Sequence, residues 1–114
     1  MNDIQAKLSP CVNILREKYP QELKKVVLVG SYARGDYKDY SDVDIFLVLD
    51  VLEKKLFSYE RKIWEITDEY LEKNEGFPYL CPIADALSNY RYLKKVMPLY
   101  RNIDKEGVIL YECT

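Results

Sequence analysis

The chain has 114 residues, carries 17 Lys and Arg against 19 Asp and Glu, and contains no histidine. This length fits one domain, residues 1–114, because one core then buries roughly 65% of the unfolded surface. The missing histidine excludes Ser-His-Asp triads, Cys-His pairs and zinc helices of the H-E-x-x-H type. Catalysis in this chain therefore has to use carboxylates, hydroxyls, Lys, Arg or a bound metal.

The distribution of charge and cysteine excludes further classes of protein. Neither half of the chain is strongly basic, so direct binding along a nucleic acid is not expected. Cys11, Cys81 and Cys113 are far apart, which predicts neither a disulfide framework nor a zinc site. The N-terminus has no apolar signal region, and no run reaches the ~18 apolar residues of a membrane span. We expect a cytoplasmic protein that does not bind membranes.

The first half of the chain shows one helical and two strand patterns. Ser9 and Pro10 resemble an N-cap followed by a first helical proline, so a helix is predicted to start there. Residues 2–8 form either a separate turn or an earlier helix that is kinked at Pro10. The apolar runs at 25–29 and 45–49 predict buried strands, and the second of them is apolar on both faces.

The second half begins with the clearest helix of the chain. Apolar residues recur at spacings of four and three from Leu52 to Tyr70, which predicts an amphipathic helix on one side of a sheet. Residues 79–85 and 107–111 are strand candidates, the latter at a sheet edge, and residues 88–97 predict a helix that Pro98 ends. The fold class is therefore α/β (α+β), with a central mixed sheet of about four strands flanked by helices.

One short motif carries the predicted chemistry: Gly30-Ser31, a spacer of ten residues, and Asp42-Val43-Asp44. Gly30 ends a strand, so the chain can turn sharply and a ligand can approach its backbone. Ser31 lies near a helix N-terminus, where free N–H groups favour phosphate. Asp42 and Asp44 are two apart on a strand, so both carboxylates face one side, about 7 Å apart. The motif predicts a Mg²⁺ site beside a polyphosphate site; the alternative is an ordinary turn with capping residues.

The stretch GSYARGDYKDYSDVDIFLVLD resembles the signature of the minimal nucleotidyltransferases of the DNA polymerase beta superfamily. The amphipathic helix that follows and the ending NIDKEGVILYE extend the resemblance over most of the chain. The resemblance implies a nucleotidyltransferase fold and the transfer of a nucleoside monophosphate from an NTP, with ATP the expected substrate, to a hydroxyl. By similarity, Gly30 and Ser31 hold the triphosphate, and Asp42 and Asp44 hold two Mg²⁺ ions.

Further candidate residues follow in part from the same resemblance and in part from the residues themselves. A third carboxylate on a neighbouring strand usually completes such sites as a metal ligand or base, and Asp85 is the candidate, with Glu65 weaker. Asp85 could equally cap the helix that follows it. Arg34 either contacts phosphate or pairs with a nearby aspartate in the loop. Most of the 11 tyrosines are expected to pack, although Tyr90, Tyr92 and Tyr100, with Leu93 and Met97, could form a partner surface.

The resemblance also implies a partner. Minimal proteins of this kind are associated with a small helical toxin of the HEPN type, which they neutralise by adenylylating it on a tyrosine. A non-catalytic antitoxin that binds nucleotide and neutralises by occlusion is the alternative. Transfer to a small hydroxylated acceptor is the third hypothesis, which the lack of room for a second domain disfavours. Assembly as a homo-oligomer or a hetero-oligomer is left open.

Overall fold

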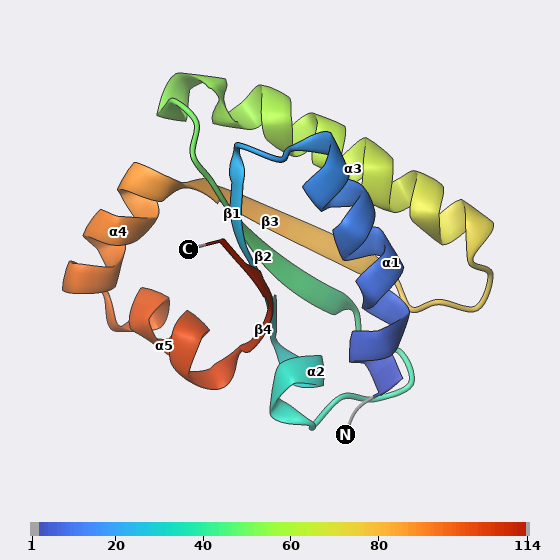
Figure 1. Cartoon of the computed structure of the whole chain (residues 1–114). Helices are drawn as coiled ribbons and strands as arrows, with labels where there is room; N and C mark the ends of the chain where they lie inside the picture. Colours follow the sequence, from blue (N-terminus) through green and yellow to red (C-terminus); the bar gives the residue numbers. More distant parts are fainter. Residues whose placement is uncertain (1–2, 114) are drawn as a thin grey trace.

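The computed structural model describes residues 3–113, and in it a four-stranded sheet lies between two layers of helices (Figure 1). The elements in chain order are α1 (Asp3–Lys18), β1 (Leu23–Val29), α2 (Ser31–Arg34), β2 (Val43–Leu49), the 3-10 helix η1 (Glu53–Lys55), α3 (Leu56–Lys73), β3 (Leu80–Ala86), α4 (Leu87–Val96), α5 (Pro98–Glu106) and β4 (Val108–Glu112). The predicted α/β class with a mixed sheet of four strands is confirmed.

The sheet has the strand order β3-β2-β1-β4. Strand β1 is antiparallel to both β2 and β4, whereas β2 and β3 are parallel. Parallel neighbours need a long crossover connection, which helix α3 provides between β2 and β3. The two central strands are the two most apolar runs of the sequence, and β4 lies at an edge as predicted.

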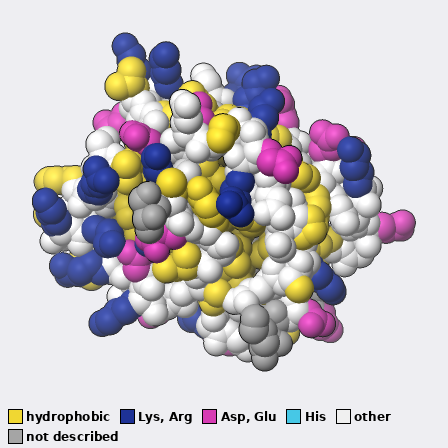
Figure 2. Space-filling model, in the orientation of Figure 1, with side chains coloured by type: hydrophobic (Ala, Val, Ile, Leu, Met, Phe, Trp, Pro, Cys, Tyr) yellow, Lys and Arg dark blue, Asp and Glu magenta, His cyan; other side chains and the backbone are white. Residues whose placement is uncertain are grey.

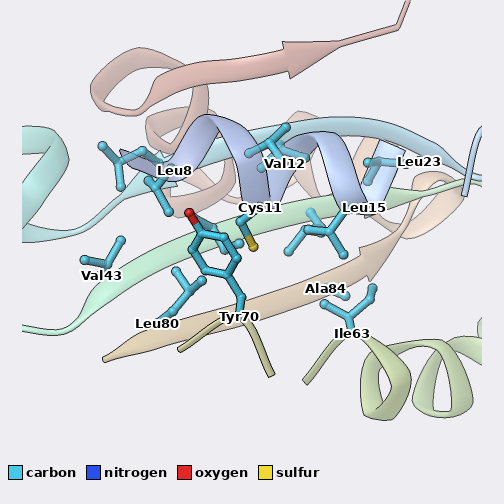
Figure 3. Packing of buried hydrophobic residues seen from close by; sticks show 14 of the residues in the cluster. Leu8, Cys11, Val12, Leu15, Leu23, Val43, Ile63, Tyr70, Leu80 and Ala84 are labelled. Atoms are coloured by element: carbon cyan, nitrogen blue, oxygen red, sulfur yellow. The ribbon is translucent and has the colours of Figure 1, made fainter. Parts of the chain in front are cut away.

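Helices α1 and α3 cover one face of the sheet and build the larger part of the core. Figure 3 shows Leu8, Cys11 and Leu15 of α1 pointing toward the sheet, with Ile63 and Tyr70 of α3 beside them. All of these side chains are at most 9% exposed. The Tyr70 hydroxyl also donates a hydrogen bond of 2.8 Å to a backbone carbonyl of α1, so the two helices are joined by a polar contact as well as by packing.

Two predicted helix boundaries are wrong. Helix α1 is continuous through Pro10, so Ser9 is not its N-cap. Residues 3–8 belong to this same helix, and residue 2 lies outside the described residues. Proline removes one backbone donor from a helix interior, but Ile4 and Leu8 are buried on the same face as the later core residues, and this packing outweighs the loss. In the second helix, Leu52 is 60% exposed and precedes η1 instead of beginning α3.

Helices α4 and α5 cover the other face of the sheet. A smaller cluster there contains Phe46 of β2 and Tyr90 of α4, with Tyr100 of α5 partly buried beside them. The ring centroids of Phe46 and Tyr100 lie 6.0 Å apart in an edge-to-face arrangement. This layer contains fewer buried side chains than the α1–α3 layer, which leaves part of the sheet accessible next to α5.

A partly buried ion-pair network attaches α5 to the sheet and to α4. Lys25 of β1 and the Tyr90 hydroxyl each donate to the same oxygen of Asp104 at 2.7 Å, and Lys94 of α4 pairs with its other oxygen. Burial by itself would raise the pKa of Asp104, but the hydrogen bonds from these three donors lower it to about 2. Asp104 is therefore a structural carboxylate that fixes the position of α5.

Candidate functional site

The predicted motif forms one site at the end of the sheet where β1 turns into α2. Gly30 caps α2 with φ of 74° and ψ of −155°, a backbone conformation that is essentially restricted to glycine. Asp44 lies beside this turn, because its register partner in β1 is Val29. A Cβ atom added at Gly30 would lie 2.7 Å from Oδ2 of Asp44, so the carboxylate packs directly against the glycine.

Asp42 and Asp44 form an acidic pair without a compensating cation. Asp42 is exposed just before β2, and Asp44 is half-buried at the start of the strand. Burial raises the pKa of Asp44, and the nearby charge of Asp42 raises it further. None of the ion pairs among residues 3–113 involves either carboxylate. Two carboxylates that repel each other, with no basic partner, favour the binding of a cation between them.

The turn supplies donors beside this acidic pair. The Gly30 carbonyl accepts the N–H groups of Ala33 and Arg34, both at 3.1 Å, which closes the short helix α2. Ser31 is the first helical residue, so its N–H group has no acceptor within the helix. The structure thus brings together Gly30, Ser31, Asp42 and Asp44, as the motif predicts.

A pocket of about 340 Å³ is lined in part by Gly30, the residue against which the Asp44 carboxylate packs. Its floor is Phe46 and Ile83, and Phe46 shares a sheet face with Asp44 because the two are two residues apart on β2. Leu99 and Ile103 of α5 form one wall, and the Gly30 turn forms another. A ligand in this pocket would contact apolar groups on the sheet and the Gly30 turn. Sequence reasoning missed this pocket because no local pattern shows that α5 stops short of α2.

Arg34 lies on the rim of the pocket, where both predicted roles remain compatible with its position. Its Nε group donates to Asp36 at 3.3 Å, and both side chains are at least half exposed. Exposed ion pairs of this type contribute little to stability, about 0–1 kcal/mol. A phosphate group could therefore take over the guanidinium at small cost.

The structure does not bring Asp85 to the acidic pair, which corrects the prediction of a third carboxylate. In the parallel β2–β3 ladder, Asp85 is opposite Val48, four positions and roughly 13 Å beyond the partner of Asp44. Asp85 is 7% exposed, and it accepts hydrogen bonds from its neighbour Ala86, from Asn89 and from the Tyr100 hydroxyl. Through these bonds Asp85 joins β3 to α4 and α5 at the other end of the sheet. The N-cap residue of α4 is Ala86 and not Asp85, and no side chain caps the helix there.

Cys81 occupies the position where a third carboxylate from β3 would be expected. It is opposite Asp44 in the ladder, and burial and the charges of Asp44 and Asp42 raise the pKa of its thiol. No local signal distinguishes Cys81 from Asp85, because alternation puts both on one face of β3 and does not fix its register with β2. No group of three or more Cys, Asp or Glu in the described part of the chain converges to hold a metal.

The remaining candidates lie away from the site. Glu65 is exposed on α3, which covers the opposite face of the sheet from the pocket. Tyr32 is buried and stacks on Tyr37 with ring centroids 4.2 Å apart, so it packs as most of the tyrosines were expected to do. No helix within residues 3–113 has the length and apolar character needed to cross a membrane.

Comparison with known proteins identifies the family. A family model described as "Nucleotidyltransferase domain" matches residues 8–81, more than half of the chain and the whole of the Gly30 to Asp44 motif. The chain belongs to this family. The prediction that the protein is a nucleotidyltransferase is thereby confirmed. The matched segment ends at Cys81, before Asp85.

Individual relatives agree with this assignment. The nucleotidyltransferase is 51% identical over 112 residues to the "Putative protein adenylyltransferase MJ0604" of Methanocaldococcus jannaschii, covering 97% of this chain and 100% of that protein. A solved structure described as a "putative nucleotidyltransferase from Sulfolobus solfataricus" superposes with a TM-score of 0.62 at 21% identity, covering 95% of this chain and 83% of that one. A structure titled as a "toxin-antitoxin with AMP-PNP" gives a TM-score of 0.58 at 20% identity, covering 93% and 74%. These two structures share the fold of the nucleotidyltransferase.

Proposed function

We propose that this nucleotidyltransferase transfers AMP from ATP to a hydroxyl group of a partner protein, a helical toxin of the HEPN type, and so acts as an antitoxin. The observation that carries the proposal is the packing of the Asp44 carboxylate against Gly30, which also lines the pocket, with the charge of Asp42 nearby. The name of the relative that is 51% identical supports protein adenylylation, and the toxin–antitoxin structure supports the partner.

The carboxylate pair fits Mg²⁺. Its donors are hard oxygen atoms, and it lacks a basic partner among the described residues. Burial, and then the charge of Asp42, raise the pKa of Asp44, so a cation there would favour its ionised form. Asp42 and Asp44 would hold the metal, with the phosphates of the nucleotide completing its coordination. When bound, Mg²⁺ would neutralise the triphosphate and lower the pKa of the acceptor hydroxyl.

The residues of the chain then act mainly by positioning the reactants. The Gly30 turn lets a phosphate approach the backbone, and Ser31 donates to it from the start of α2. Arg34 at the pocket rim can exchange Asp36 for a phosphate oxygen. In the transfer, the acceptor oxygen bonds to the α-phosphorus, the bond from that phosphorus to the pyrophosphate oxygen breaks, and the hydroxyl proton is released to water.

A non-catalytic antitoxin is the second candidate, and one observation favours it. The mouth of the site contains two carboxylates and Cys81, where a three-acid site would be better suited to proton removal and metal binding. A protein with such a site could still bind nucleotide and neutralise the toxin by covering it. The two functions differ in whether the partner gains a covalent AMP group.

The intact mass of the partner distinguishes them. The chain and its partner are co-purified and incubated with ATP and Mg²⁺, and the partner is weighed by mass spectrometry. We expect an increase by one or more AMP units, abolished in an Asp42→Asn/Asp44→Asn variant and by chelation of the metal. Asp50→Asn is the matched control, because Asp50 is an exposed aspartate that follows the other end of β2. Neutralisation of the toxin by the double variant, with no mass increase in any sample, would establish the non-catalytic function.

A further inference from the structure

Helices α4 and α5 present an exposed apolar surface. Within the described part of the chain, α5 has no buried residue, and α4 has only Tyr90. Around the turn between the helices, Tyr92, Val96, Met97 and Leu99 are 63%, 53%, 41% and 65% exposed. Tyr92 and Val96 are four residues apart, so they share one face of α4, and Met97 and Leu99 follow at the turn into α5. Single exposed apolar residues are ordinary, but four of them within residues 92–99 indicate a surface that another molecule covers.

The same two helices are rich in basic side chains. Residues 87–106 contain five Lys and Arg and two Asp and Glu, a net charge of +3 in a chain whose total is −2. One of the two acids, Asp104, is already bound by Lys25 and Lys94. Figure 2 shows Lys and Arg gathered at the left of the molecule, over α4 and α5. We define the α4–α5 surface as the four apolar residues with the exposed cations Arg91, Lys95, Arg101 and Lys105.

The α4–α5 surface continues into the candidate active site. Leu99 belongs to the surface and also lines the 340 Å³ pocket, together with Tyr100 and Ile103 of the same helix. The floor of that pocket, Phe46, is two residues from Asp44 on the same face of β2. A molecule seated on the surface therefore lies next to the pocket and can extend a side chain into it, toward the Gly30 turn against which Asp44 packs.

We propose that the α4–α5 surface is the docking site of the acceptor protein, and that the matching face of that protein has an apolar centre and an acidic rim. The assignment of the docked protein as acceptor rests on the proposed function, whereas the chemistry of the surface does not. The basic rim selects an acidic partner and raises the rate of encounter with it. An apolar centre containing Tyr and Met with Arg around it has the composition of a protein interface.

The same charges argue against two other occupants. A second copy of the chain docked by the same surface would place two patches of net charge +3 against each other, which is unfavourable in a symmetric contact. A nucleic acid would match the cations, but its phosphates gain nothing from Val96, Met97 and Leu99 at the centre. An acidic protein face satisfies both parts of the surface at once.

The test measures partner binding separately from AMP transfer. Calorimetric titration of the purified HEPN-type partner into the wild-type chain is compared with titrations into Val96→Glu and Lys95→Glu, neither of which lines the pocket. We expect at least tenfold weaker binding for Val96→Glu, and for Lys95→Glu a loss that grows as the salt concentration falls. Phe57→Glu and Lys62→Glu on α3 are the matched controls, since Phe57 is 68% exposed on the opposite layer. Both should bind within twofold of wild type, and thermal melting confirms that all variants fold.

The outcomes separate this proposal from the proposed function. A wild-type chain that binds the partner without labelling it, while Val96→Glu loses binding, refutes AMP transfer and supports the docking site. Unchanged binding by Val96→Glu and Lys95→Glu, or no complex with the wild-type chain, overturns the docking site. It is also overturned if light scattering shows a homodimer that Val96→Glu dissociates. The docking site is overturned as well if a single-stranded RNA oligonucleotide binds the chain with an affinity that Lys95→Glu reduces and Val96→Glu does not.

Discussion

Replacing Gly30 with alanine tests the packing that builds the site. The backbone at Gly30 has φ of 74° and ψ of −155°, which costs an L-residue about 1–3 kcal/mol. The new Cβ would also lie 2.7 Å from Oδ2 of Asp44, whereas ordinary contacts begin at 3.4 Å, so the carboxylate must move by about 0.7 Å. Displacements of about 1 Å in a catalytic group can reduce the rate by about 10²-fold. We therefore expect Gly30→Ala to lose Mg²⁺-dependent AMP transfer by roughly 10–100-fold and to melt at a lower temperature.

The control separates backbone strain from the contact with Asp44. Gly76 also has a positive φ, of 90°, but a Cβ there would meet nothing within 4 Å, and it lies in the loop after α3. Gly76→Ala should therefore lower the melting temperature, by roughly 4–8 °C per kcal/mol of strain, while activity stays at the wild-type level. The assays are differential scanning calorimetry and AMP transfer by mass spectrometry. Wild-type activity in Gly30→Ala, with a stability loss equal to that of Gly76→Ala, would refute the role given to the close contact.

Three further predictions concern carboxylates and Cys81. Burial and a neighbouring charge raise the pKa of Asp44, so without metal its ionisation costs the folded state stability as the pH rises above the ordinary 3.8. Without metal, Asp44→Asn should therefore raise the melting temperature at pH 7 but not below pH 3.8. The same variant should abolish stabilisation by Mg²⁺. Equal stabilisation of the variant and the wild type by Mg²⁺ would exclude Asp44 as a ligand. The pKa of Asp104 is lowered to about 2, so Asp104→Asn should lower the free energy of unfolding in urea by about 2 kcal/mol at pH 7. That difference should shrink as the pH falls from about 4 to 2, and a constant difference would contradict the assigned ion pairs. Cys81→Asp should tighten Mg²⁺ binding in calorimetry, whereas Asp85→Asn should leave it unchanged and reduce stability; the opposite result would place Asp85 at the metal site.

Local sequence patterns were sufficient for most of the elements. The two central strands are runs of apolar residues that only a covered sheet can bury, and α3 repeats its apolar residues at helix spacing over four turns. The start of α1 was not predictable in this way, because the signal at Ser9 and Pro10 is local. The burial of Ile4 and Leu8, which extends the helix, depends on contacts with distant parts of the chain.

The candidate site, like the fold, could be predicted only in part from the sequence. The spacing of Gly30, Ser31, Asp42 and Asp44 was sufficient to place them together, since a strand end, a turn and the next strand are neighbours in almost any sheet. Alternation along β3 puts Cys81 and Asp85 on one face of the strand, but it does not say which of them lies opposite Asp44. Register between strands is decided by packing across the whole sheet.

By itself, the sequence determined the class of fold, the motif that is proposed to carry the chemistry and the exclusion of histidine-based catalysis. These properties depend on residue types and on short spacings along the chain. Only the tertiary structure decided that Cys81 and not Asp85 faces the acidic pair, and that α5 leaves a pocket beside it. It also placed exposed apolar and basic residues of α4 and α5 next to that pocket. These relations join residues that are tens of positions apart, and their distances are set by how the layers pack.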